Sequence, residues 1–210
     1  PEVPMNKQSG VRVPAILMRE AIRRTVFAVT TEQSRFSIAG AKLLLDESHL
    51  IMVATDGHRL AYAQFPFVNS TGQQLDLLIP KKSLNQLEDL LDRELKRDAE
   101  SAIEISDTGN QLCFVVGSRT LFSRKLSGTF PNYEMVLPKK LDYAAEISTE
   151  DFRESLSRVT LTSETKNHSV TMEIHPGKLL LKAGTGEAEA QEEIMAVLSG
   201  ENGQNVFSLS

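Results

Sequence analysis

Hydrophobic and polar positions along the first part of the chain predict a strand, a helix and three further strands. Residues 10–13 form a short strand pattern, and Pro14 suits the first turn of the helix that follows. That helix covers residues 15–29, where apolar positions recur every three or four residues, as one helix face requires. Its apolar face consists of Met18, Ile22, Val26 and Val29. Three strands with tight connections are predicted at residues 36–47, 49–55 and 58–65.

A second unit with the same order of elements follows. Residues 79–95 predict a helix, and Ser83 with Gln86 three positions later has the spacing of a capping box. The apolar face of this helix consists of Leu84, Leu87 and Leu91. Three more strands are predicted at residues 101–106, 111–117 and 120–128. We therefore expect two strand–helix–three-strand halves in residues 10–127, with both helices in one layer and antiparallel sheets outside, an α+β fold.

After residue 127 the pattern stops and then restarts. Residues 128–142 contain two prolines and show no clear period, which is typical of a linker. From residue 143 the chain predicts a strand, a helix cap at Ser148 or Thr149, and a helix.

Two short patterns return at nearly constant spacing. Arg-Glu-x-Ile-x-Arg at residues 19–24 returns as Arg-Glu-x-Leu-x-Arg at 153–158, a shift of 134 positions. "KLLL" at residues 42–45 returns at 178–181, a shift of 136 positions. Because the two matches keep their order, they indicate duplication of a whole domain.

The composition is that of a globular protein without a membrane segment. Hydrophobic residues make up 40% of the 210 residues, and no apolar run approaches the roughly 20 residues that span a bilayer. We recognise no signal peptide and expect a cytoplasmic protein. The one cysteine, Cys113, lies in an apolar run, which predicts a buried and inert thiol.

The net charge of −5 is unevenly distributed. Residues 12–35 carry five arginines against two glutamates, whereas residues 183–201 carry five glutamates and no base. Basic helix faces repeated along a chain suit a regular polyanion such as duplex DNA, whose phosphates are contacted without regard to sequence. A solvated helix face is the simpler alternative, and the pattern leaves both open.

The stretch "TDGHRL" places Asp56, His58 and Arg59 within four positions. An acid and a histidine so close could form a catalytic dyad or bind a metal. The other histidines are scattered, and no second acid has the spacing that would complete either kind of site. The pattern alone favours an Asp-Gly turn between two strands, and we predict no catalytic residues, metal or cofactor.

Four stretches together resemble the bacterial DNA polymerase III beta subunits, the sliding clamps. They are "GVRVPAILMREAIRRTVFAV", "VATDGHRLA", "IPKKSLNQLEDLL" and "FPNYEMVLPK", and residues 155–174 fit the start of the family's third domain less closely. The resemblance implies the DNA clamp fold, in which each domain has two β-α-β-β-β halves with helices on the inner layer and antiparallel sheets outside. It also implies three such domains per chain and two chains closing head to tail into a ring around duplex DNA.

The resemblance divides the chain into four parts. Residues 1–9 would be the end of a linker from a missing first domain, and residues 10–127 the complete second domain. Residues 128–142 would be the interdomain linker, and residues 143–210 the first half of a truncated third domain. The full-length protein would be a ring-shaped homodimer, and this chain alone a monomer or a non-native dimer.

The function implied by the resemblance is that of a non-catalytic processivity factor. It would encircle duplex DNA, independently of sequence, and tether the replicative polymerase and clamp-loader subunits through short linear peptides bound in a groove, with no membrane partner. The groove residues implied are Ile38, Thr55, Gly57, His58, Arg59, Leu60, Pro131, Met135 and Val136. The DNA-binding residues expected are Arg19, Arg23, Arg24, Gln33, Arg35, Phe36, Ser37, Lys81, Lys82 and Lys166. The alternative is a repeat-built protein-interaction scaffold that does not bind DNA.

Overall fold

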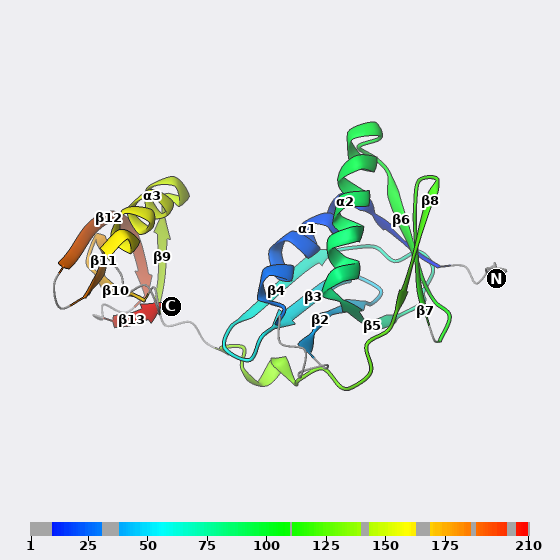
Figure 1. Cartoon of the computed structure of the whole chain (residues 1–210), viewed down its shortest axis with the longest axis horizontal. Coiled ribbons are helices and arrows are strands. Elements are labelled where there is room, and N and C mark those ends of the chain that lie inside the picture. The colour runs from blue at the N-terminus through cyan, green and yellow to red at the C-terminus, as the bar shows by residue number, and fades with distance from the viewer. Residues whose placement is uncertain are drawn as a thin grey trace. The chain divides into compact units, whose positions relative to one another are not determined.

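The computed structural model describes residues 10–30, 38–109, 111–139, 143–162, 169–185, 188–200 and 205–209. The chain divides into two compact units, Pro1–Val136 and Leu137–Ser210, and each is described by itself (Figure 1). None of the described helices is long and apolar enough to cross a membrane.

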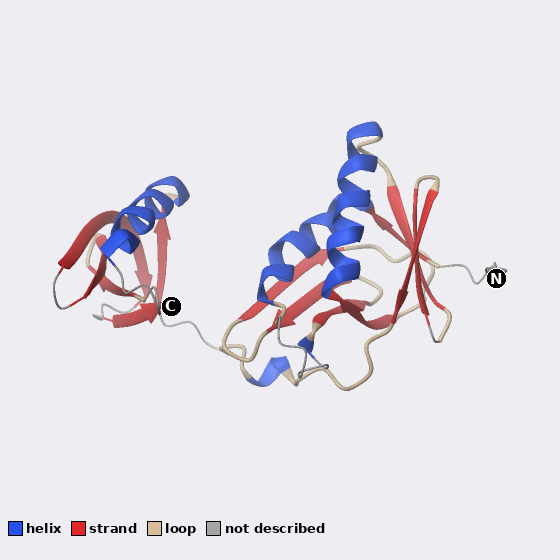
Figure 2. Cartoon of the chain, viewed as in Figure 1, coloured by secondary structure: helices blue, strands red, loops and turns tan. Residues whose placement is uncertain are grey.

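The first unit contains two strand–helix–three-strand halves, as the sequence predicts (Figure 2). The first half consists of β1 (Val11–Pro14), α1 (Ala15–Thr25) with a 3-10 turn η1 (Val26–Ala28), β2 (Gly40–Leu45), β3 (His49–Thr55) and β4 (Leu60–Pro66). The second half consists of β5 (Leu75–Pro80), α2 (Lys81–Arg97), β6 (Ala102–Asp107), β7 (Gln111–Val116) and β8 (Arg119–Arg124).

The two halves exchange their first strands. One antiparallel sheet has the order β4-β3-β2-β5 and the other the order β1-β6-β7-β8, so each half supplies the edge strand of the other half's sheet. Helices α1 and α2 contact each other and lie side by side (Figure 1). The exchange ties the halves into one domain with a single layer of helices.

The strand-to-helix junctions of the two halves match. Pro14 ends β1 opposite Ala102, and Pro80 ends β5 opposite Gly40. The first N–H of α1 donates to the carbonyl of Ser101 at 2.9 Å, and that of α2 donates to the carbonyl of Ala39 at 3.1 Å. Each helix therefore begins directly after a proline and satisfies its first N–H on the other half.

The predicted capping box at the start of α2 is wrong. The helix begins at Lys81, so Ser83 lies inside its first turn, and its hydroxyl group bonds the hydroxyl group of Ser123 at 2.7 Å. Pro80 holds the N-cap position without a side-chain hydrogen bond.

The core of the first unit lies between the helix layer and the two sheets. The helices contribute most of the predicted apolar faces, including the fully buried Met18 and Leu87. The predicted end of the first helix at residue 29 is wrong, because α1 ends at Thr25 and Val26 and Val29 lie in and after η1. The strands contribute alternate residues, such as Leu43 and Phe114. Cys113 precedes Phe114 on β7, so its side chain lies on the opposite, outer face of the sheet. It is only half-buried there, and the prediction of a buried thiol is wrong.

The described residues of the second unit form the helix α3, a 3-10 turn and an antiparallel sheet. Its elements are β9 (Tyr143–Ile147), α3 (Thr149–Val159), η4 (Thr160–Thr162), β10 (Val170–His175), β11 (Lys178–Thr185), β12 (Ala188–Gly200) and β13 (Asn205–Leu209). The strand order is β13-β10-β11-β12-β9. Ser148 is the N-cap of α3, where its hydroxyl group accepts from the N–H of Asp151 at 3.3 Å, which decides between the two predicted caps.

The structure supports one of the two repeat matches. Helix α1 spans residues 15–25 and α3 spans 149–159, so both ends shift by the predicted 134 positions. The "KLLL" match is wrong, because residues 42–45 lie in the first strand after α1, whereas residues 178–181 lie in the second strand after α3. A lysine followed by three leucines is too common a pattern to identify equivalent strands.

Candidate nucleic-acid and partner-binding sites

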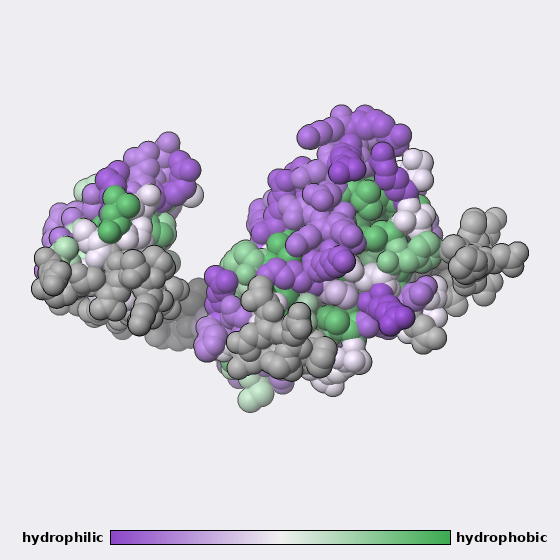
Figure 3. Space-filling view, viewed as in Figure 1, coloured by the Kyte–Doolittle hydropathy of each residue, from purple (hydrophilic) through white to green (hydrophobic). Residues whose placement is uncertain are grey.

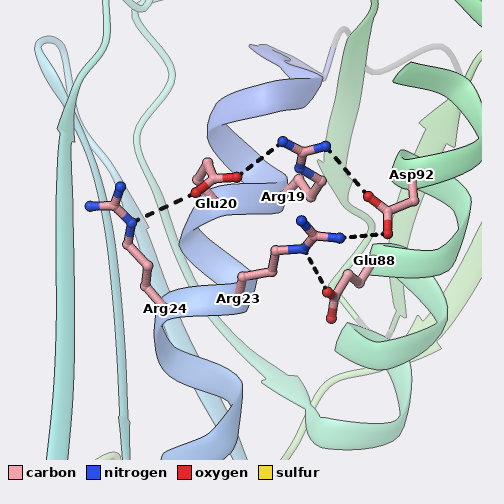
Figure 4. A network of polar contacts seen from close by, with 6 residues as sticks. All are labelled: Arg19, Glu20, Arg23, Arg24, Glu88 and Asp92. Atoms are coloured by element: carbon pink, nitrogen blue, oxygen red, sulfur yellow. Dashed lines mark hydrogen bonds and ion pairs between the residues drawn. The ribbon is translucent and has the colours of Figure 1, made fainter. Parts of the chain in front are cut away.

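The arginines predicted to contact DNA form an ion-pair network between α1 and α2 (Figure 4). Arg23 reaches across to α2, where its Nε lies 3.0 Å from an oxygen of Glu88 and a terminal nitrogen lies 2.8 Å from an oxygen of Asp92. The hydrogen bond to Glu88, together with the negative charges of Asp92 and Glu88, raises the pKa of the Arg23 guanidinium. The partners of Arg23 thus come from the neighbouring helix.

The other two arginines complete the network. Arg19 lies 3.1 Å from Glu20 and 3.5 Å from Asp92, measured between nitrogen and oxygen. Arg24 lies 3.8 Å from Glu20, and its guanidinium stands 5.2 Å from the centre of the Phe65 ring. Three arginines therefore face three carboxylates, and the charges within the network balance.

The lysines at the start of α2 differ in their surroundings. The ammonium group of Lys81 donates to the carbonyl of Val29 at 2.9 Å, which fastens the start of α2 to the chain after α1. Lys82 is exposed. The remaining predicted DNA-binding residues, Gln33, Arg35, Phe36, Ser37 and Lys166, lie outside the described residues.

The "TDGHRL" stretch forms a tight turn between β3 and β4. One carboxylate oxygen of Asp56 accepts from the backbone N–H groups of His58 and Arg59, both at 3.0 Å. Burial opposes ionisation of Asp56, but these hydrogen bonds outweigh it and lower its pKa. Gly57 has a φ of 92°, a backbone conformation that glycine adopts most readily. Asp56 therefore organises the turn, as the Asp-Gly pattern predicts.

Arg59 connects this turn to η1, the 3-10 turn after α1. Its Nε lies 3.1 Å from the second oxygen of Asp56, and a terminal nitrogen donates to the carbonyl of Phe27 at 3.2 Å. The guanidinium also stands 5.6 Å from the centre of the Phe27 ring, a distance at which a cation and an aromatic face attract.

The residues after β8 lie against the sheet that carries the turn. The buried Tyr133 has its ring centre 6.0 Å from that of Tyr62, two positions after Leu60 on β4. Met135 and Val136 are 80% and 68% exposed. Among the other predicted groove residues, Ile38 and Thr55 are buried, Leu60 is half-buried, and Gly57, His58, Arg59 and Pro131 are exposed. The Tyr62–Tyr133 contact thus brings the linker segment to the strand that leaves the turn.

Comparison with known proteins identifies the family of this chain. Residues 12–132 match the family model of the DNA polymerase III beta subunit, central domain, and residues 134–208 match that of its C-terminal domain. The chain belongs to the DNA polymerase III beta subunit family. The predicted clamp fold and family are therefore confirmed.

Relatives of this beta subunit chain are sliding clamps from diverse bacteria. The beta sliding clamp of Halalkalibacterium halodurans is 32% identical over 99% of this chain and 57% of its own length. The crystal structure of the Bacillus subtilis clamp is similar with a TM-score of 0.87 at 27% identity, covering 100% of this chain and 55% of that one. A Pseudomonas aeruginosa clamp bound to griselimycin has a TM-score of 0.86 at 26% identity over 99% of this chain and 55% of its own. The chain thus spans about half the length of the relatives it matches.

Sequence reasoning missed the acidic half of the network in this beta subunit chain. Glu88 and Asp92 are four positions apart on α2, and Arg19 and Arg23 are four positions apart on α1. Complementary charges at the same helical spacing on two neighbouring helices were the available signal.

Proposed function

We propose that this chain is part of a sliding clamp, a non-catalytic processivity factor that holds duplex DNA and tethers the replicative polymerase. The family match over both units carries the proposal. Residues 10–127 are assigned to the second clamp domain, 128–142 to the interdomain linker and 143–210 to part of the third. The assignment is supported by the order of elements and by the extents of the two matches.

The proposed DNA-facing surface is the exposed side of α1 and α2. Hydrophilic residues cover this side (Figure 3). Helix α1 carries three arginines against one glutamate, and α2 carries five bases against four acids, so the pair keeps an excess of three positive charges. A modest positive excess supports weak, sequence-independent contact with phosphates.

The proposed partner site is a groove beside the "TDGHRL" turn and the linker segment. It would bind a short linear peptide from the polymerase or from another partner. Exposed Met135 and Val136 and half-buried Leu60 offer apolar contacts, and Arg59 offers a fixed cation. The griselimycin complex of the Pseudomonas aeruginosa clamp supplies a compound with which to test the site. A scaffold that binds peptides without DNA is the alternative function.

The first prediction concerns DNA. Fluorescence anisotropy with a short labelled duplex of mixed sequence should show binding that weakens as salt rises, because phosphate contacts release counterions. Replacing Arg24 and Lys82 with glutamine should weaken binding on the order of tenfold and flatten its salt dependence. The matched control replaces Arg12 and Arg124, which are exposed on strands β1 and β8, and should change affinity little. Equal losses in both pairs, or no salt-dependent binding at all, would favour the scaffold.

A further inference from the structure

The network between α1 and α2 restrains the basic groups that the proposed function needs. Arg23 is 44% exposed in its side chain, which leaves it accessible from solvent, yet its Nε and one terminal nitrogen already donate to Glu88 and Asp92. A phosphate approaching Arg23 meets two partly exposed carboxylates, with side-chain exposures of 25% and 32%. It must compete with them for the guanidinium and overcome their repulsion.

We propose that Glu88 and Asp92 act as internal counterions that keep the affinity of the helix pair for duplex phosphates low. The inference rests on the proposed function, because it concerns the same surface. With Arg23 occupied, fewer counterions are released when DNA binds, and the electrostatic part of the affinity falls. A surface that holds the duplex loosely allows the protein to move along it.

The second unit contains a similar arrangement. Arg158 occupies the position of Arg24 in the repeat shifted by 134. Its Nε and a terminal nitrogen lie 2.8 Å and 3.0 Å from the two oxygens of Glu192 on β12, and Glu154 is 3.6 Å away. The pair of Arg158 with Glu154 repeats the pair of Arg24 with Glu20 at the same shift. The carboxylates from outside the helix come from different elements, α2 in the first unit and β12 in the second.

A purely structural role explains the network less well. Exposed ion pairs contribute only about 0–1 kcal/mol each to stability. The contact between the helices and the sheets is instead supplied by buried apolar residues such as Met18, Leu84 and Leu87. Removing the carboxylates should therefore leave the fold intact and change mainly the response to a polyanion.

The test compares duplex affinity in two variants that each lose two negative charges. Glu88→Gln with Asp92→Asn should bind the labelled duplex on the order of tenfold more tightly, with a salt slope steeper by about one counterion. The control, Asp89→Asn with Glu100→Gln, removes two exposed carboxylates from α2 and the turn after it and should gain less than about twofold. The single variant Glu88→Gln should give an intermediate gain, and circular dichroism checks that each variant is folded.

A third substitution identifies the group that is released. Arg23→Gln should abolish most of the gain in the Glu88→Gln, Asp92→Asn background. Equal gains in the network and control variants, or no gain in a chain that still binds DNA, would overturn the inference alone. No duplex binding by any of these chains would overturn the proposed function and the inference together.

Discussion

At the scale of single residues, the chemistry of Asp56 is decided by its own backbone. An aspartate two positions before a histidine could form a reactive pair. In the structure, however, both carboxylate oxygens of Asp56 accept hydrogen bonds within the turn. The sequence was sufficient to predict the turn, because Asp-Gly between strands is a local signal. It could not predict that Arg59 contacts Phe27, since 32 positions separate them and only the packing of α1 on the sheet brings them together.

A prediction at this scale concerns Leu60. If the groove beside the turn binds peptides, Leu60→Ala should weaken griselimycin binding, measured by calorimetry, by roughly 1–3 kcal/mol, the usual cost of removing an apolar contact from a binding pocket. Leu121→Ala, which truncates another half-buried leucine on strand β8, is the matched control and should leave the affinity unchanged. Equal affinities for all three chains would show that Leu60 does not line the pocket.

At the scale of elements, patterns with a clear period were predicted well and apolar runs without one were not. The apolar faces of α1 and α2 and the strand hairpins appear where the sequence pattern places them. The repeated order of elements predicted a strand before α2, but the pattern did not locate it at β5, "LDLLIP", because a run of apolar residues fits a strand or a helix equally well. Its pairing with β2, from Leu45↔Leu75 to Gly40↔Pro80, decides the matter. These partners are 30 to 40 positions apart in the sequence, so only the folded structure brings them together.

A prediction at this scale compares the two strand-to-helix junctions. A Cβ at Gly40 would lie 2.1 Å from the carbonyl oxygen of Ile79 and 2.7 Å from a methyl group of Leu126. Gly40→Ala must therefore push β2 and β5 apart, at an expected cost of about 1–3 kcal/mol in the free energy of unfolding by urea. The equivalent position of the other half already holds alanine, so the control Ala102→Gly should cost only about 0.5–1 kcal/mol. Similar losses in both variants would contradict the steric explanation.

At the scale of the whole molecule, the resemblance predicted the family and the fold, but not how the charges are arranged. A chain with 28 acidic and 23 basic residues can distribute them in many ways. The structure pairs arginines of α1 and α3 with carboxylates from other elements, and these contacts depend on tertiary packing. Paired carboxylates therefore neutralise part of the positive charge that the sequence indicates for these segments. Because acid protonates carboxylates and breaks such pairs, the stability of the folded protein is sensitive to acid.

The last prediction concerns this acid sensitivity. The hydrogen bond from Arg158 lowers the pKa of Glu192, and hydrogen bonds from Lys182 and His175 lower that of Glu173. Because the folded-state pKa lies below the unfolded value, the stability contributed by each group is present above about pH 4.5 and is lost as the pH falls through the folded-state pKa.

The urea midpoint of the natural chain should therefore drop below about pH 5. Glu192→Gln should lower the midpoint at neutral pH, have a shallower pH dependence, and converge with the natural chain once the pH falls below the folded-state pKa of Glu192. Glu47→Gln, which removes an exposed carboxylate from the turn between β2 and β3, should run parallel to the natural chain. If Glu192→Gln also ran parallel to it at every pH, the pairing of Arg158 with Glu192 would contribute nothing to the pH dependence.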